Sequence, residues 1–98
     1  MVERQDNDER VIRLYVAGDA PSSRDVRRLL TELTSNASSV RIDCEVVDVL
    51  RDPARALHAR LLATPTLIVE NGSRSERFVG QQHSQRELAR LLDSYRQG

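Results

Sequence analysis

The chain of 98 residues has a single cysteine, Cys44, and contains neither tryptophan nor lysine. One cysteine excludes an internal disulfide and fits a reducing compartment. No hydrophobic run approaches the roughly 20 residues that a membrane-spanning helix needs. The first ten residues are polar and charged and lack the pattern of a signal peptide. We therefore expect a cytoplasmic protein.

An excess of charge of one sign is also missing, because 15 arginines balance 15 acidic residues. A chain without net charge has no global attraction for nucleic acid or for an anionic membrane. Aromatic residues make up only 3% of the chain, so there is no stacking platform for single-stranded nucleic acid. We expect a disordered tail over residues 1–9 and one globular domain over residues 10–98 that binds neither nucleic acid nor membrane.

The aliphatic residues that are present follow the periods of strands and helices. Strands are predicted over residues 11–18, 40–50, 66–70 and 74–80, and helices begin near residues 22, 53 and 84. Ser22 with Asp25, and Ser84 with Glu87, have the spacing of capping boxes. Asp52 followed by Pro53 is typical of a helix start. The second helix is expected to reach about residue 62, with Ala54, Leu57 and Leu61 facing inward.

Asn71-Gly72 lies between the last two predicted strands and favours a type I′ hairpin. The resulting order, β-α-β-α-β-β-α, predicts a parallel first pair of strands with a right-handed crossover. This is the order of a thioredoxin-like α/β sandwich: a four-stranded mixed sheet with helices on both faces, the first strand inside and the second at the edge. Pro65 stands where that fold has a structural cis-proline.

Residues for catalysis are missing from the places where this fold class carries them. A redox member would have a cysteine pair after the first strand, where residues 18–23 read GDAPSS, so thiol–disulfide exchange cannot occur there. His58 and His83 have no cysteine or carboxylate at the spacing of metal ligands. Cys44 shares one face of the predicted second strand with Val40, Ile42 and Val46 and is expected to be buried and structural. We predict no enzyme, no metal and no cofactor, and hence a binding module.

Three segments resemble the KaiB family of circadian-clock proteins: LYVAGDAPSS (14–23), EVVDVLRDP (45–53) and LLATPTL (61–67). They occur in the family's order and at its separations, and Phe78-Val79-Gly80 resembles the IIG that follows. The resemblance implies a non-enzymatic adaptor in circadian or stress regulation. Its implied partners are a KaiC-like ATPase or a sensor histidine kinase, and a KaiA-like protein.

The resemblance also implies a metamorphic protein, in which a tetramer with a rearranged second half converts into a thioredoxin-like monomer that binds partners. Where family members commonly carry a proline-rich segment, this chain has Asn71-Gly72, which promotes a hairpin. We therefore predict a monomer that rests in the thioredoxin-like, fold-switched topology. The tetrameric alternative fold stays open.

The predicted partner-binding residues lie on the edge strand and around the second helix: Arg41, Asp43, Glu45, Arg51, Arg55, His58 and Arg60. Edge strands are templates for docking, although a solvated surface explains each charged side chain as well. Cyanobacterial members tend to be basic where this chain has Asp43 and Glu45, which predicts altered specificity. An alternative is a non-catalytic thioredoxin-like module that binds a thiol or peptide in the groove beside Pro65.

Overall fold

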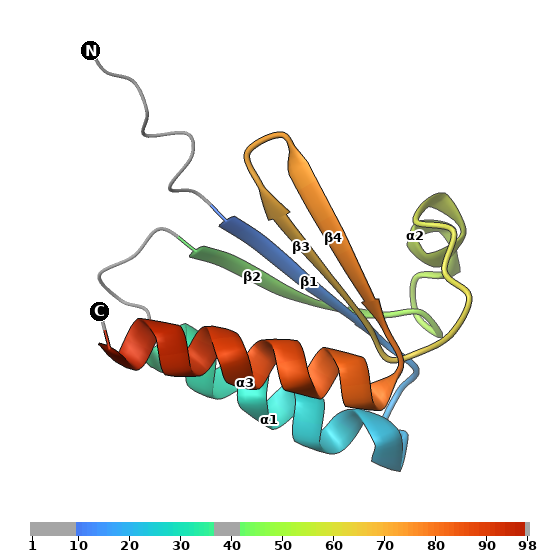
Figure 1. The fold of residues 1–98 in the computed structure, drawn as a ribbon. Helices are drawn as coiled ribbons and strands as arrows, with labels where there is room; N and C mark the ends of the chain where they lie inside the picture. Colours follow the sequence, from blue (N-terminus) through green and yellow to red (C-terminus); the bar gives the residue numbers. More distant parts are fainter. Residues whose placement is uncertain (1–9, 37–41, 98) are drawn as a thin grey trace.

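The computed structural model describes residues 10–36 and 42–97, so the tail predicted for residues 1–9 lies outside the described part of the chain. The elements are β1 Arg10–Val16, α1 Pro21–Asn36, β2 Ile42–Asp48, α2 Pro53–His58, β3 Thr66–Asn71, β4 Arg74–Val79 and α3 Gln81–Gln97. They form one mixed sheet with the strand order β2-β1-β3-β4 (Figure 1). β1 is parallel to β2 and antiparallel to β3, and β4 returns antiparallel to β3. The predicted thioredoxin-like topology is confirmed.

The two long helices, α1 and α3, lie side by side across one face of the sheet (Figure 1). Their apolar stripes bury Val26, Leu30 and Leu33 from α1 with Leu88, Leu91 and Leu92 from α3. The sheet contributes Ile12, Leu14, Val16, Leu67 and Val69. These aliphatic side chains form the main core, as the sequence periodicity predicts. Among the described helices, none is both long and apolar enough to cross a membrane.

The opposite face of the sheet, called the open face below, buries far less. Its hydrophobic cluster consists of Tyr15, Val47 and Ile68, with Val49, Ala59 and Leu61 partly buried against it. α2 and the loop that follows it lie over one end of this face (Figure 1). α2 spans only six residues and buries none of them, and Leu57 is largely exposed. The expectation that this helix reaches residue 62 with Leu57 inward is therefore wrong: six residues cannot build an apolar stripe.

The hairpin between β3 and β4 forms as predicted, but its turn is shifted by one residue. Asn71 pairs with Arg74, so the loop consists of Gly72 and Ser73. Gly72 has φ +65°, and Ser73 is not among the residues with positive φ. One positive φ at the first loop position is the pattern of a type II′ turn, not of the predicted type I′ turn. The peptide bond between Thr64 and Pro65 is cis, as predicted.

The three helices begin within three residues of the predicted starts, but only one of the three predicted caps is confirmed. Asp52 caps α2, its carboxylate accepting a hydrogen bond from the Arg55 amide at 3.4 Å, and Pro53 follows. The capping boxes are wrong because α1 and α3 begin upstream of their serines, at Pro21 and Gln81. Ser84 lies inside α3, where its hydroxyl donates to the Phe78 carbonyl at 3.0 Å.

Candidate partner-binding surface

Arg55 joins α2 to the open face of the sheet. Its guanidinium makes a two-pronged ion pair with the carboxylate of Glu45 on the edge strand β2, with N–O distances of 2.5 and 2.9 Å. Parallel N–H groups of arginine match the two oxygens of a carboxylate. The hydrogen bond from Arg55 is the main cause that lowers the pKa of Glu45, and the nearby charges of Arg55 and Arg13 lower it further.

The pair belongs to a row of alternating charges across the open face. Arg13 on the inner strand β1 lies 3.5 Å from Glu45 and 3.2 Å from Glu70 on β3. The register places Arg13 directly opposite Glu45, so the charges are neighbours by the pairing of the strands. The row Arg55–Glu45–Arg13–Glu70 thus runs from α2 across the open face as a line of paired charges.

Arg77 of β4 holds the other end of the α2 segment. Its guanidinium donates to the carbonyl of Ala59 at 2.7 Å and to that of Arg60 at 3.2 Å, at the point where α2 ends. Arg60 has φ +56°, a left-handed conformation in which a non-glycine residue is uncommon. Arginine at a helix C-terminus satisfies carbonyls that have no partner within the helix. Arg77 therefore fixes the direction in which the chain leaves α2.

Asp48, the last residue of β2, organises the loops next to α2. Its Oδ1 accepts hydrogen bonds from the amide of Gly18 at 2.9 Å and from the amide of Leu50 at 3.0 Å. These bonds to the charged carboxylate are the main causes that lower the pKa of Asp48. Gly18 has φ +57°, and a side chain there would also meet Leu50 Cδ1 at 3.3 Å. One carboxylate thus ties the loop after β1 to the turn that leads into α2.

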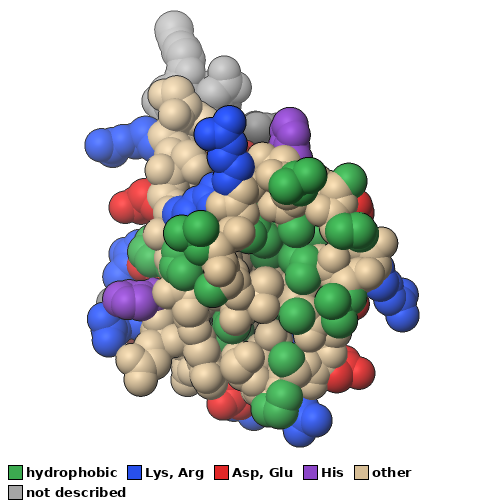
Figure 2. Space-filling view, turned by 90° about the vertical axis from the view of Figure 1, so that its right-hand side faces the viewer, with side chains coloured by type: hydrophobic (Ala, Val, Ile, Leu, Met, Phe, Trp, Pro, Cys, Tyr) green, Lys and Arg blue, Asp and Glu red, His purple; other side chains and the backbone are tan. Residues whose placement is uncertain are grey.

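Large apolar side chains project from this segment into solvent. Leu50 is 71% exposed, Leu57 80% and Leu62 91%. Figure 2 shows hydrophobic side chains at the surface on the side of the molecule where α2 lies in Figure 1. A single exposed leucine is ordinary, but three within thirteen residues at one end of a small domain are typical of a docking surface. We call Leu50, Leu57 and Leu62 the exposed leucine group.

A cavity of about 400 Å³ lies between α2 and the open face, and its lining includes Arg13, Tyr15, His58, Ile68 and Arg77. It combines an apolar floor with charged walls, as binding clefts commonly do. Arg55, whose guanidinium pairs with Glu45, forms part of its wall.

The structure brings together some of the predicted partner-binding residues and separates others. Glu45 and Arg55 are paired, and His58 lies beside them in the cavity lining. Arg51 lies 3.9 Å from Asp48 and lines a second cavity together with Arg55. Asp43 is exposed on β2, and Arg60 is exposed and acts through its backbone. Arg41 lies outside the described residues, and the partner-binding role of the whole set stays a prediction.

Sequence reasoning missed the exposed leucine group and the central charge of the open face, Arg13. It also missed Asp48 and Arg77, which hold the two ends of the α2 segment. The spacing of leucines after Asp52 resembles a core-facing stripe, so periodicity alone hides their exposure. The brevity of the segment before Pro65 was a signal that the helix is too short to cover a core.

Cys44 is half-buried at the edge of the main core, where Ile42 also packs, so the prediction of a buried cysteine is only partly met. Burial raises the pKa of its thiol above the ordinary value of 9.0. A raised pKa lowers the thiolate fraction and hence the reactivity at neutral pH. Among the described residues, no group of three or more His, Cys, Asp and Glu side chains could hold a metal ion.

Solved structures with this topology include thioredoxins and the N-terminal domain of SasA. The germline thioredoxin Deadhead from the fruit fly aligns with a TM-score of 0.72 at 14% identity, covering 91% of this chain and 83% of its own. The N-terminal domain of Synechococcus elongatus SasA aligns with a TM-score of 0.68 at 18% identity, covering 100% of this chain and 93% of its own. At these identities the likeness shows the fold alone.

Sequence comparison assigns the family. The circadian clock oscillator protein KaiB of Prochlorococcus marinus strain MIT 9312 is 39% identical over 57 residues, covering 58% of this chain and 54% of the relative. The chain thus spans about half the length of the curated relatives that it matches at this level. The circadian clock protein KaiB3 of Synechocystis is 26% identical over 88 residues, covering 90% and 86%. The model of the KaiB domain matches residues 13–94, and the chain therefore belongs to the KaiB family.

Proposed function

We propose that this protein is a non-enzymatic KaiB-family adaptor that docks on a KaiC-like ATPase or a signalling kinase in circadian or stress regulation. The contact surface consists of the edge strand β2, the helix α2 and the loop after it. The protein acts as a monomer, with residues 10–98 as its single domain. A KaiA-like protein is a further partner of the same surface.

The exposed leucine group is the observation that carries the proposal. Burying apolar surface is the main favourable term in protein association. In this group the side chains of Leu57 and Leu62 are the most exposed to solvent. The adjacent edge of β2 has unpaired backbone groups that can receive a partner strand. Family membership supports the same conclusion, because the matched relatives are named as clock proteins.

The paired charges of the open face support specificity more than affinity. Glu45 is already neutralised by Arg55 and Arg13, whereas Asp43 on the same strand is exposed and has no ion pair with the described residues. A partner with a basic side chain opposite Asp43 would associate faster than one with an acidic side chain there. Asp43 is therefore the residue that distinguishes partners at the edge strand.

A backbone-assigned NMR spectrum of the labelled protein, titrated with the host's own KaiC-like ATPase, tests the proposal. We expect loss of signal over residues 42–62. The double variant Leu57→Ser/Leu62→Ser should bind at least tenfold more weakly, because apolar anchors dominate such contacts. Arg24→Gln is the matched control, since Arg24 is exposed on α1 on the other side of the sheet.

Both serine substitutions lie on exposed positions, so the fold should survive and thermal unfolding should match the parent. An unchanged spectrum with the ATPase and with a host kinase bearing a KaiB-like sensor domain would refute the proposal. If the double variant binds as tightly as the parent, the contact surface does not include Leu57 and Leu62.

A further inference from the structure

The register of the sheet places two arginines on either side of an asparagine at the hairpin end. Arg10 of β1 lies opposite Asn71 of β3, and Asn71 lies opposite Arg74 of β4. Residues directly opposite one another on neighbouring strands share a face of the sheet. Val69, the next residue of β3 on that face, belongs to the main core, so the row Arg10–Asn71–Arg74 faces the helices.

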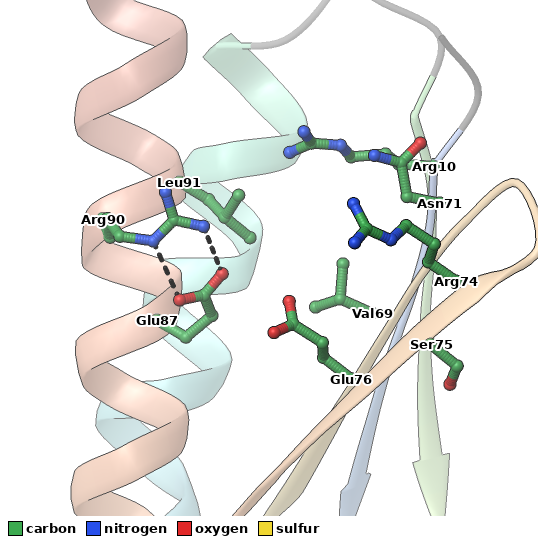
Figure 3. A pocket seen from close by; sticks show the side chains of 9 residues that line it. All are labelled: Arg10, Val69, Asn71, Arg74, Ser75, Glu76, Glu87, Arg90 and Leu91. Carbon is green, nitrogen blue, oxygen red and sulfur yellow. Dashed lines mark hydrogen bonds and ion pairs between the residues drawn. The ribbon is translucent and has the colours of Figure 1, made fainter. Parts of the chain in front are cut away.

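α3 closes this end of the sheet and turns the row into a pocket (Figure 3). The pocket has a volume of about 390 Å³, with Val69 and Leu91 as its apolar floor. Glu87 and Arg90 of α3 form the facing wall and are joined by two hydrogen bonds of 2.9 and 2.6 Å. Glu87 is only 8% exposed, and its charge is balanced by that of Arg90, so this wall has no net charge.

The opposite wall carries charge that the described part of the protein does not neutralise. The side chain of Arg74 points into the pocket in Figure 3 and makes no hydrogen bond or ion pair with the described residues. Arg10 is held in place by the Tyr95 hydroxyl at 3.0 Å, with its guanidinium 5.8 Å from the centre of the Tyr95 ring. That contact uses one N–H of Arg10 and leaves the others available.

Asn71 supplies a second, independent indication of a ligand. Its Oδ1 is buried and has no hydrogen-bond partner among the described residues. A buried acceptor without a donor costs free energy, and such atoms in native proteins call for an explanation. The orphan oxygen belongs to the residue between the two arginines, and Asn71 is one of the residues that line the same pocket.

We propose that this pocket binds a small organic oxyanion that also carries an N–H or O–H donor. Arg74 and Arg10 bind the oxyanion, which is a carboxylate or a phosphate, because a guanidinium matches both. The donor of the ligand satisfies Asn71 Oδ1. Glu76, which also lines the pocket and has no ion pair with the described residues, accepts a second donor and disfavours a bare polyanion.

The volume limits the ligand to about the size of a mononucleotide or a dipeptide, since small-molecule pockets begin near 300 Å³. These two sources share the proposed chemistry: one offers a phosphate with hydroxyl and amine donors, the other a carboxylate with an amide N–H. The site faces the helices at the hairpin end of the sheet, whereas α2 lies over the other face at the far end (Figure 1). The proposed ligand site is therefore separate from the proposed docking surface.

Separate NMR titrations of the full chain with AMP, with glycylglycine and with inorganic phosphate test the site. We expect AMP or glycylglycine to shift the amides of residues 71–76 and 87–91 in a saturable manner. Arg74→Gln and Asn71→Ala should each weaken that binding roughly tenfold, the loss expected for a charge-assisted or buried hydrogen bond. Arg24→Gln on α1 should leave it unchanged.

Saturable binding of AMP alone supports a phosphate source, and binding of glycylglycine alone supports a carboxylate source. No shift with any probe would overturn the proposal. It would be overturned equally if inorganic phosphate bound as tightly as the organic probes, or if Asn71→Ala left their affinity unchanged, because either result means an adventitious ion only. Thermal unfolding of each variant confirms that the fold is retained.

Discussion

The two faces of the sheet are built in different ways. Under α1 and α3, eleven aliphatic side chains form one continuous core. On the open face, three buried residues form the cluster, and α2 is attached by Arg55, Arg77 and Asp48 through ion pairs and hydrogen bonds. Apolar burial supplies most of the free energy of folding, whereas exposed ion pairs contribute little.

The difference implies that the two regions have different local stabilities. Segments with few buried apolar contacts and solvent-exposed hydrogen bonds open at a lower free energy than the core. The α2 segment meets both conditions. The helical face thus maintains the fold, and the segment proposed to dock on a partner lies in the part of the molecule that opens most readily.

The largest expected effect is a difference in the free energy of unfolding between two leucine variants, one in the main core and one in the α2 segment. Leu88→Ala should lower the free energy of unfolding by about 3 kcal/mol, since Leu88 is fully buried in the main core. Leu57→Ala, with the same change of side chain, should cost less than about 0.5 kcal/mol. Urea unfolding of both variants measures the contrast. A cost for Leu57→Ala similar to that for Leu88→Ala would show that α2 covers a core in solution.

A smaller effect is expected from Arg77→Met, which keeps an apolar stem and removes the guanidinium. The amides of Ala59, Arg60 and Leu61 close the end of α2 with hydrogen bonds of 3.0 to 3.3 Å. Without the bonds from Arg77 to the nearby carbonyls, their hydrogen exchange should accelerate roughly threefold to tenfold. Arg74→Met on the same strand is the control and should leave these amides unchanged. If hydrogen exchange at these amides accelerates equally in both variants, Arg77 does not position the end of α2.

The acid dependence of stability should be smaller again and should come from Glu45 on the open face and from Asp48 at the end of β2. The pKa values of Glu45 and Asp48 are lowered in the folded chain from ordinary values of 4.5 and 3.8. The unfolded chain therefore binds more protons in this range. The stabilisation is present above the ordinary values and is lost as the pH falls through the lower folded pKa values.

Urea midpoints measured from about pH 6 down to about pH 3 would follow this loss. Asp48→Asn should flatten the acid slope, because it removes one of the two carboxylates. Asp93→Asn is the control, since Asp93 is exposed on α3. An acid slope for Asp48→Asn identical to that of the parent would assign the acid sensitivity to other groups.

The smallest effect is expected in the reactivity of the Cys44 thiol, which can be measured without a substitution. Because burial raises its pKa above 9.0, the rate of alkylation by iodoacetamide should keep rising with pH beyond that value in the folded protein. In urea the same thiol should level off at a lower pH. Coincident profiles in the two conditions would mean that the edge of the core beside β2 opens readily.

Much of the fold could be predicted from local patterns. The aliphatic periods of α1 and α3 identify the buried leucines, and Asp52-Pro53 identifies the start of α2. The cis peptide bond at Pro65 follows from the place of that proline before β3. The predicted boxes at Ser22 and Ser84 failed because the same residue types also occur inside helices, where Ser84 bonds to Phe78.

The candidate surface was less predictable, because it depends on contacts between segments that are distant in the sequence. Arg55 and Glu45 are ten residues apart, and only the position of α2 over the sheet brings them together. Arg10 and Asn71 meet through the strand register, which a shift of one residue would destroy. Periodicity shows that Leu57 repeats with its neighbours but does not show whether a sheet lies beneath it.

The absence of any buried residue in α2 has a consequence for how such proteins diverge. Mutation at Leu57 or His58 does not threaten folding, so under the proposed docking role selection at these positions would act on recognition. Substitutions at Leu14 or Leu88 are removed by loss of the folded state whatever the partner. Duplicated copies of such a gene can therefore acquire new partners through changes in one short exposed segment, while the rest of the chain preserves the scaffold that presents it.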